Sequence, residues 1–379
     1  MAEIGHKAHE DLLTDGLHLN KKEREELLKK ILDGINEEDK LDEPEKEALG
    51  EPISNELIEL ALKESAYGSA SGINGILYEY WKFLNKTKQE NIGNQQYKNL
   101  NIIKSLAMVY NDIEEFGVDP SSKFTIGWMC LLYKKGDKRL IENYRPITLL
   151  NTDYKIYTKA LAIKLAKAAP EIVHKNQAGS MPGRSITDQI CLAKLMVHYS
   201  ETTEQNGLIV ALNQEKAYNK ICHDYLTHIL KNYNLPDQFI NMVKSLYENA
   251  KTVVVINGVI SAPFRVARGV RQGDPLSCLL FNLAIELLGN MLRKSNTLQG
   301  FQIPGKEEHL KVTLFTDDTT VYLKQNNEME KLFEILDEWC IVSGAKFNTK
   351  KTVILPIGTP TYRLGGRGPV PGTHESFRL

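Results

Sequence analysis

The sequence predicts an α+β fold in which an antiparallel sheet is backed by helices. Residues 208–213 form an apolar run typical of a buried strand, and residues 278–288 form one of helical length. Short apolar runs also flank the pair Asp317-Asp318. Two such runs around a short polar pair indicate a β-hairpin, so both carboxylates are expected at a hairpin tip.

The other elements follow in chain order. Residues 21–32 predict a charged helix, and residues 37–52 predict an acidic linker with few large apolar residues. Ser54 is a candidate N-cap for the next helix. Residues 71–76 predict a turn and residues 124–132 a strand before a basic turn. Further helices are expected around residues 78–83, 154–167 and 187–199.

The composition of the chain argues against a disulfide-rich, secreted or membrane-spanning protein. A chain of 379 residues with 42% hydrophobic content can bury two or three cores. Its five cysteines show neither metal-ligand nor disulfide spacing, which favours a reducing compartment. No apolar run has the length of a membrane span, and residues 1–10 lack the features of a signal peptide. We therefore expect a soluble intracellular protein without a membrane partner.

Charge is divided unevenly along the chain. The whole chain carries −1, and residues 1–65 carry 19 acidic against 9 basic side chains, a net of −10, so the other 314 residues carry +9. The segment from Lys134 to Arg139 concentrates this basic charge. Such a cluster predicts salt-sensitive phosphate contacts. For this cluster taken alone, a solvated turn is the alternative.

Six motifs follow one another along the chain: residues 143–150 (NYRPITLL), 177–188 (QAG and RSITD), 208–220, 268–277 (RGVRQGDPLS), 315–318 (FTDD) and 348–352 (NTKKT). In this order they resemble the motifs of the reverse transcriptases of LINE-type, non-LTR retrotransposons. The "RQGDPLS" form and the Phe315 that precedes the aspartates favour this branch over retroviral or intron-encoded relatives. The resemblance covers about residues 54–357.

The resemblance implies a right-hand polymerase-like fold with fingers and palm, the palm sheet being antiparallel and the thumb absent or truncated. The implied activity is that of an RNA-directed DNA polymerase, with an RNA template, a DNA primer, dNTPs and Mg²⁺, for which Mn²⁺ can substitute. The expected location is the nucleus or the cytoplasm, and the nucleus if the enzyme is functional. The expected parts are an acidic helical extension or linker (1–52), a fingers-like subdomain (53–200), a palm-like subdomain (201–358) and a disordered tail (359–379).

The resemblance also implies roles for single residues. Asp317 and Asp318 would hold two Mg²⁺ ions about 3.5–4 Å apart, with Asn213 and Gln214 on the facing strand. Lys351 would protonate the departing pyrophosphate, and Tyr218 would exclude a 2′-hydroxyl. The resemblance further implies that the nucleotide is contacted by Arg145, Lys134, Gln272 and Gly273. It implies that the template is contacted by Arg184 and Arg271.

Asn213 departs from the family, which has an aspartate there. An amide keeps one oxygen acceptor but loses the negative charge and the second ligating oxygen, and Mg²⁺ prefers carboxylates. Losing one such ligand should lower the rate by about 10³-fold or more. Neighbouring Glu215 is not expected to replace it. Asn219 also replaces a family aspartate, but as an expected helix cap, where Asn and Asp are nearly equal.

Several residues differ from those expected in the family, and each difference corresponds to a single G→A change at the first codon position. This pattern suggests a decayed copy of the element. Drift within an active lineage is the alternative. Two further functions stay open beside the polymerase: a catalytically inactive nucleic-acid-binding remnant, and a translated fragment with no selected role. The departures lie at Asn74, Met181, Asn213, Asn219 and Thr316.

Overall fold

The computed structural model describes residues 2–14, 21–90, 101–303, 305, 307–324 and 328–365. The chain forms two compact units, each assembled from separate segments. Within the described ranges, no helix is both long and apolar enough to cross a membrane. Unit 1 comprises Met1–Gly16, Leu41–Ala168 and Cys222–Leu280, and unit 2 comprises Leu17–Lys40, Ala169–Ile221 and Phe281–Leu379.

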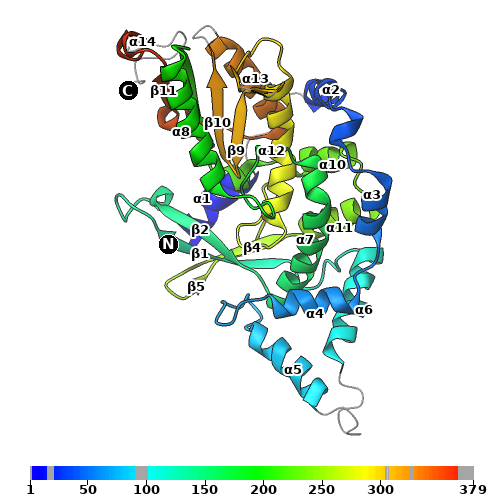
Figure 1. Ribbon diagram of the computed structural model, residues 1–379. Coiled ribbons are helices and arrows are strands. Elements are labelled where there is room, and N and C mark those ends of the chain that lie inside the picture. Colours follow the sequence, from blue (N-terminus) through cyan, green and yellow to red (C-terminus); the bar gives the residue numbers. More distant parts are fainter. Residues whose placement is uncertain are drawn as a thin grey trace. The chain divides into compact units, whose positions relative to one another are not determined.

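Unit 1 contains a mixed sheet (Figure 1). β1 and β4 run parallel, and the other pairs run antiparallel, so that Cys130 lies opposite both Ile147 and Val255. The strands are rich in β-branched and aromatic residues, as such a sheet requires. The order is β2 (Tyr144–Leu149), β1 (Ile126–Tyr133), β4 (Lys251–Ile256) and β5 (Val259–Ile260), and β6 (Phe264–Arg265) pairs with the other end of β4.

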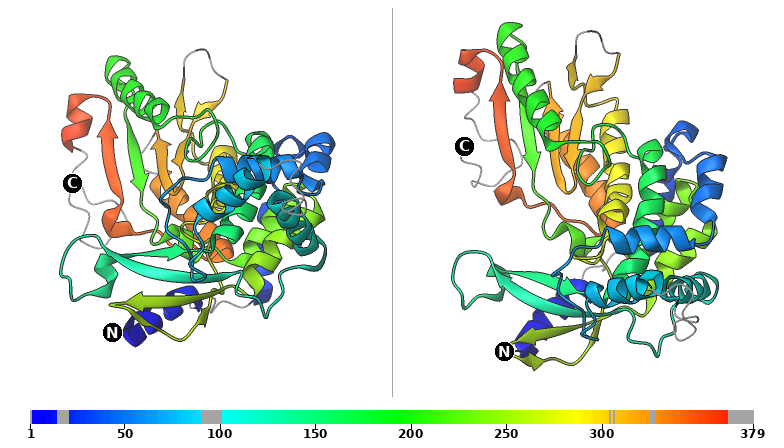
Figure 2. Two further views of the ribbon diagram at one scale, coloured as in Figure 1. Left: turned by 90° about the horizontal axis from the view of Figure 1, so that it is seen from below. Right: turned by 60° about the horizontal axis from the view of Figure 1, so that its bottom comes forward.

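Buried aromatic side chains hold the helices of unit 1 together. The rings of Tyr110 and Tyr157, both fully buried, lie 4.9 Å apart. Helix α1 lies against β4 and β6 (Figure 2), where His6 stacks on Phe264 at 5.0 Å. The helices are α1 (Ala2–Thr14), α3 (Glu43–Gly50), α4 (Asn55–Lys63), α5 (Tyr78–Glu90), α6 (Ile102–Phe116), α7 (Thr152–Ile172), α10 (His223–Asn232) and α11 (Asp237–Glu248).

An antiparallel four-stranded sheet forms the centre of unit 2. Its order is β11 (Val353–Ile357), β3 (Gly207–Leu212), β10 (Asp318–Leu323) and β9 (Val312–Phe315). β9 and β10 form the predicted hairpin, and β3 pairs with β10 and β11. A small ribbon of β7 (Phe301–Gln302) and β8 (His309–Leu310) completes the strands of this unit.

Helices cover the two faces of this sheet. On one face, Ile209 and Tyr322 pack with Met196 of α8 in a shared apolar cluster. On the other face, α12 approaches so closely at Gly289 that an added Cβ would lie 3.2 Å from Leu314. The helices of unit 2 are α2 (Lys21–Leu32), α8 (Ile186–Thr202), α9 (Ala217–Lys220), α12 (Ser277–Lys294), α13 (Glu328–Ser343) and α14 (Pro360–Gly365). The part of α12 that belongs to this unit begins at Phe281.

Most of the expected elements are present, and the Ser54 cap is confirmed, since its hydroxyl accepts from Leu57 N at 3.2 Å. The linker prediction for residues 37–52 is wrong. The helix α3 forms there, capped by Asp42, and Leu41 and Leu49 are each only 2% exposed. Two well-placed leucines are therefore enough to anchor a segment that looks hydrophilic overall.

Two further expectations need correction. Residues 360–365 form α14, beside Thr359 N, which donates to Asn206 Oδ1 at 2.9 Å, so the disordered tail does not begin at residue 359. Residues 366–379 of that tail lie outside the described residues. Asn219 is not a helix cap, because it lies inside α9, whose N-cap is Lys216, and α10 is capped at Cys222.

Candidate functional site

The β9–β10 hairpin turns through only two residues, Thr316 and Asp317. Asp318 pairs with Phe315, so the second aspartate is the first residue of β10. Asp317 is half-buried and Asp318 is exposed. Thr316 has φ +56°, a left-handed conformation that costs a β-branched residue about 1–3 kcal/mol. The surrounding structure must therefore hold this turn in place.

The end of β3 meets the hairpin tip. Leu212 pairs with Thr319, and the same register continued by one residue places Asn213 opposite Asp318. One residue further, the Gln214 side-chain Nε2 donates to the Asp317 main-chain oxygen at 3.2 Å. The structure thus brings Asn213, Asp317 and Asp318 to one end of one sheet, although about a hundred residues separate them.

The electrostatics of this end reflect two neighbouring carboxyl groups. Burial raises the pKa of Asp317, and the charge of Asp318 adds to that increase, while a backbone hydrogen bond opposes it. A cation bound between them would remove this repulsion. Among the described residues, no group of three or more His, Cys, Asp or Glu side chains is arranged for a metal ion. The donor set here is two carboxylates and one amide, so the residues fit Mg²⁺ only in part.

Gln214 is buried beside the hairpin tip. The residue is 6% exposed, its Nε2 donates to Asp317 O at 3.2 Å, its Oε1 has no hydrogen-bond partner within the described part of the chain, and alternation along the strand turns it away from the Asn213 face. Its role as a metal ligand stays a prediction. Glu215 is engaged as well, since its carboxylate pairs with Lys220 at 3.8 Å and Lys346 at 3.4 Å.

The turn that carries Lys351 adjoins the same strand end. Asn348 N donates to Asn213 O at 2.7 Å, and Lys351 N donates to Asn348 O at 3.1 Å, within a short 3₁₀ turn over Thr349–Lys351. Lys351 itself is exposed. An exposed ammonium is thereby attached to the strand end at which Asn213 lies.

Tyr218 lies on α9, directly after that strand end. Its half-buried ring stacks on Phe281 of α12, with ring centroids 4.8 Å apart and planes 7° from parallel. A ring held by stacking loses little further entropy on meeting a ligand and can serve as a rigid surface.

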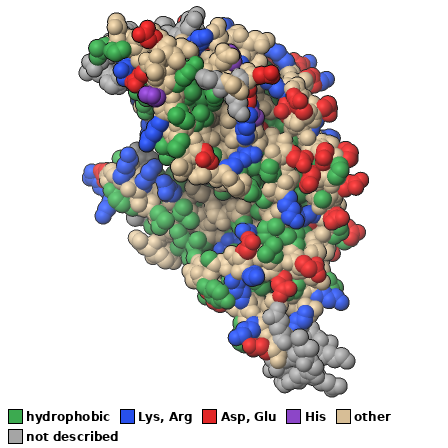
Figure 3. All heavy atoms as spheres, in the orientation of Figure 1, with side chains coloured by type: hydrophobic (Ala, Val, Ile, Leu, Met, Phe, Trp, Pro, Cys, Tyr) green, Lys and Arg blue, Asp and Glu red, His purple; other side chains and the backbone are tan. Residues whose placement is uncertain are grey.

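The other nucleotide candidates belong to unit 1. Lys134 and Arg145 lie on the β1–β2 hairpin, where both are exposed, and Figure 3 shows Lys and Arg side chains gathered at this hairpin. Gln272 is half-buried in the loop before α12. Gly273 follows with φ +105°, and an added Cβ would lie 2.7 Å from Thr148 O, so only glycine fits there without strain.

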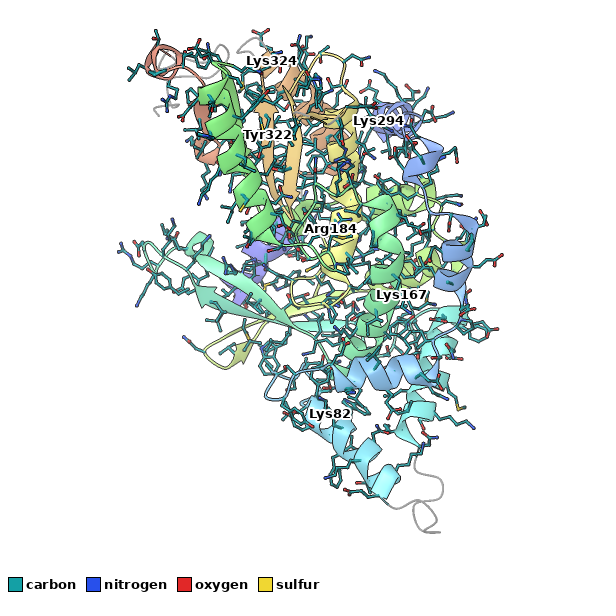
Figure 4. The ribbon with its side chains drawn as sticks, in the orientation of Figure 1. Lys82, Lys167, Arg184, Lys294, Tyr322 and Lys324 are labelled. Carbon is teal, nitrogen blue, oxygen red and sulfur yellow. The ribbon has the colours of Figure 1, made fainter. Side chains whose placement is uncertain are left out.

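Both arginines expected to contact the template bind the main chain. Arg271 is 4% exposed, and its guanidinium donates to Thr125 O at 2.6 Å and Lys251 O at 3.2 Å. Arg184, labelled in Figure 4, donates to the carbonyl oxygens of residues 173, 174 and 177 at 2.6–2.9 Å, just beyond the end of α7. Arg271 therefore has little exposed surface for a template, whereas the template contact of the half-buried Arg184 stays a prediction.

One important residue of this end escaped the sequence reasoning. Gln177 is fully buried, and its side chain hydrogen-bonds both the N–H and the C=O of Thr316 in the hairpin turn. The motif Gln177-Ala178-Gly179 marked the segment as family-like. Nothing in the sequence of this motif indicated that the segment folds against a turn about 140 residues away.

Comparison with known proteins identifies the family. The model of the reverse transcriptase (RNA-dependent DNA polymerase) family matches residues 133–365. An uncharacterised 149 kDa protein of transposon TX1 from Xenopus laevis is 32% identical over 310 residues, which cover 82% of this chain and 22% of that protein. A probable RNA-directed DNA polymerase from transposon BS of Drosophila melanogaster is 24% identical over 294 residues, covering 74% of this chain and 31% of that protein.

A third relative is the retrovirus-related Pol polyprotein of the R2DM element of Drosophila melanogaster, 26% identical over 210 residues, which are 55% of this chain and 19% of that protein. The chain thus spans between about a fifth and a third of the length of these three relatives. The motifs, the site at the sheet end and these matches agree. The chain belongs to the reverse transcriptase (RNA-dependent DNA polymerase) family, in the branch found in non-LTR retrotransposons.

Proposed function

We propose that the four-stranded sheet of unit 2 is the palm of a right-hand polymerase, and that its exposed end carries out RNA-directed DNA synthesis. The register that continues to Asn213 opposite Asp318 is the observation that supports this most. Directly opposed residues of antiparallel strands have Cβ atoms about 4.5–5.5 Å apart. Side chains at that spacing can share metal ions.

In the proposed reaction, the primer 3′-oxygen forms a bond to the α-phosphorus of a dNTP, and pyrophosphate leaves. Mg²⁺, or Mn²⁺ in its place, would lower the pKa of the 3′-hydroxyl and offset charge on the leaving group. Asp317 and Asp318 would hold the metal through their carboxylate oxygens. Lys351 would give a proton to the pyrophosphate, whose negative charge grows as the bond breaks.

Asn213 is the proposed ligand that binds metal less well than the carboxylate of the family. Its amide oxygen can complete one coordination position but cannot bridge two cations as a carboxylate does. We therefore propose that the chain keeps the geometry of the family site while its activity is impaired at this position.

The proposal also assigns residues that select and bind the nucleotide. Tyr218, held flat against Phe281, would exclude the 2′-hydroxyl of an rNTP by contact with the sugar. The exposed Lys134 and Arg145 would contact the triphosphate, and Gln272 and Gly273 the nascent base pair. The same proposal assigns the fingers to residues 53–200 and the palm to residues 201–358. The RNA template and the DNA primer are the proposed partners.

The test compares primer extension on an RNA template by three versions of the chain: unmodified, Asn213→Asp, and Asn213→Asp with Asp317→Asn. We expect Mg²⁺-dependent dNTP incorporation by the second version and its loss in the third, because Asp317 supplies a ligand that no neighbour replaces. Incorporation that survives Asp317→Asn would contradict the proposed site.

A nucleic-acid-binding remnant is the second candidate, favoured by Asn213. Phosphate contacts from the basic β1–β2 hairpin do not depend on the metal ligands. The unmodified chain should therefore bind an RNA–DNA hybrid with an affinity that falls about tenfold or more between 50 and 200 mM salt. Fluorescence anisotropy would measure this. Affinity that does not change with salt would exclude binding by phosphate contacts.

A further inference from the structure

The segment before α8 supports the hairpin that carries the two aspartates. Ala178 N donates to Leu314 O at 2.9 Å, and Leu314 N donates to Asn176 O at 2.8 Å, so the segment runs parallel to β9 and pairs with its outer edge. The edge strand of the sheet is thereby closed by main-chain hydrogen bonds up to the residue before Phe315.

The side chain of Gln177 extends this contact into the turn itself. Its Oε1 accepts from Thr316 N at 2.9 Å and from Gly179 N at 2.9 Å, and its Nε2 donates to Thr316 O at 3.3 Å. One buried amide therefore satisfies both main-chain groups of the residue that precedes Asp317. These are the contacts that a left-handed turn residue needs in order to stay in that conformation.

The half-buried Thr316 is closely approached on the side that faces Gly179. An ideal Cβ on Gly179 would lie 2.2 Å from both the main-chain nitrogen and the hydroxyl oxygen of Thr316, so no larger residue fits there without displacing the turn. Gly179 O in turn accepts from Asn282 Nδ2 of α12 at 2.7 Å. The segment that contacts the turn is thus itself hydrogen-bonded to α12.

The segment is itself anchored. Arg184 Nη1 donates to the Gln177 main-chain oxygen at 2.8 Å and to His174 O at 2.6 Å, which ties the segment to the end of α7. Gln189 of α8 adds a hydrogen bond from Nε2 to Asn176 O at 3.0 Å. Gln177 therefore acts from a fixed base.

We infer that Gln177 is a positioning residue for the metal-binding end of the sheet: it holds Thr316 in its left-handed conformation and so sets the direction of Asp317. This inference rests on the proposed function for the role of Asp317, and on the structure for the contact. Gln177 touches no reacting atom. It acts through the turn.

The experiment uses the full chain with Asn213→Asp and asks what Gln177→Met does. Methionine has nearly the shape of glutamine, but its thioether cannot donate to Thr316 O and is only a weak acceptor for Thr316 N. We expect Mn²⁺ affinity, measured by electron paramagnetic resonance, to fall about tenfold. We expect kcat for extension to fall about 10²-fold, with the KM for dNTP changed less than threefold, because small displacements of catalytic groups cost rate.

Gln189→Met is the matched control. It removes a glutamine hydrogen bond to the same segment, at Asn176, without touching the hairpin. Its melting temperature should fall, but less than that of Gln177→Met, because one side-chain hydrogen bond is lost instead of three, while Mn²⁺ affinity and kcat stay unchanged. Equal losses of Mn²⁺ affinity in both variants would overturn the inference, because Gln177 would then contribute only to stability.

Thr316→Gly supplies the rescue. Glycine adopts a positive φ without strain, so adding Thr316→Gly to Gln177→Met should restore at least half of the lost Mn²⁺ affinity and kcat. No recovery would also overturn the inference. If Gln177→Met does not fold, Gln177→Asn takes its place, since it keeps an amide in the segment but shortens its reach to Thr316 by one methylene.

The two readouts separate the inference from the function beneath it. Mn²⁺ binding needs no primer, template or dNTP. If no version extends a primer and the Mn²⁺ losses follow the expected pattern, the proposed polymerase activity fails and the positioning role stands. If extension occurs and Gln177→Met leaves both readouts unchanged, the activity stands and the positioning role is wrong.

Discussion

Asn213→Asp is expected to raise the rate of primer extension by about 10³-fold over the unmodified chain, with Tyr218 still selecting dNTP over rNTP. The substitution restores a bridging carboxylate on β3, opposite Asp318, and changes no other contact of the strand end. Single-turnover extension with Mg²⁺ on both versions measures the effect.

Mg²⁺ affinity distinguishes two alternative sources of the proposed loss of activity. If position 213 is the main lesion, affinity and extension should rise together. A version that gains affinity but still does not extend would show that primer and template are not held in line, and would place the deficit outside position 213. Asn219→Asp is a suitable control, since it adds the same charge within α9 and should change extension less than threefold. Robust synthesis by the unmodified chain would refute the claim that Asn213 impairs the site.

The largest expected effect on stability is that of Arg293→Met. Glu286 of α12 is completely buried and pairs with Arg293, whose side chain is 10% exposed. Removing the arginine leaves a buried carboxylate without its cation, which should lower the free energy of unfolding by about 3–5 kcal/mol. Urea denaturation measures this. The double variant Glu286→Leu, Arg293→Met should be far less destabilised, because an apolar pair replaces both charges.

The loss should depend on pH. Burial raises the pKa of Glu286, while Arg293 opposes that increase. Without the arginine the folded-state pKa should rise further above the unfolded value of 4.5, so the folded protein favours the protonated form. Stability is then retained near pH 4.5 and lost as pH rises through the folded-state pKa. Arg293→Met should accordingly be less destabilised at pH 5 than at pH 8, and equal losses would contradict this assignment.

The sequence predicted best where local patterns carry the information. Alternating and continuous apolar runs located β3, the hairpin and α12, and Ser54 indicated the start of α4. The family motifs located the aspartates and Asn213. Residue type alone did not reveal that Arg271 is buried against the main-chain oxygens of Thr125 and Lys251, or that Arg184 binds carbonyls 7 to 11 residues before it in the chain. Gln177 was missed for the same reason, since its role exists only once residue 316 is folded against it.

The order of strands in the unit 2 sheet has a consequence for folding during translation. β3 is central in the sheet, but its partners β10 and β11 lie about 110 and 145 residues later in the chain. At ribosomal rates of about 5–20 residues per second, the apolar strand at residues 207–212 must wait roughly 7–30 s for its last partner. During that time its hydrogen-bonding edge and apolar side chains are open to other chains, so chaperone demand should be highest for products that end between β3 and β11.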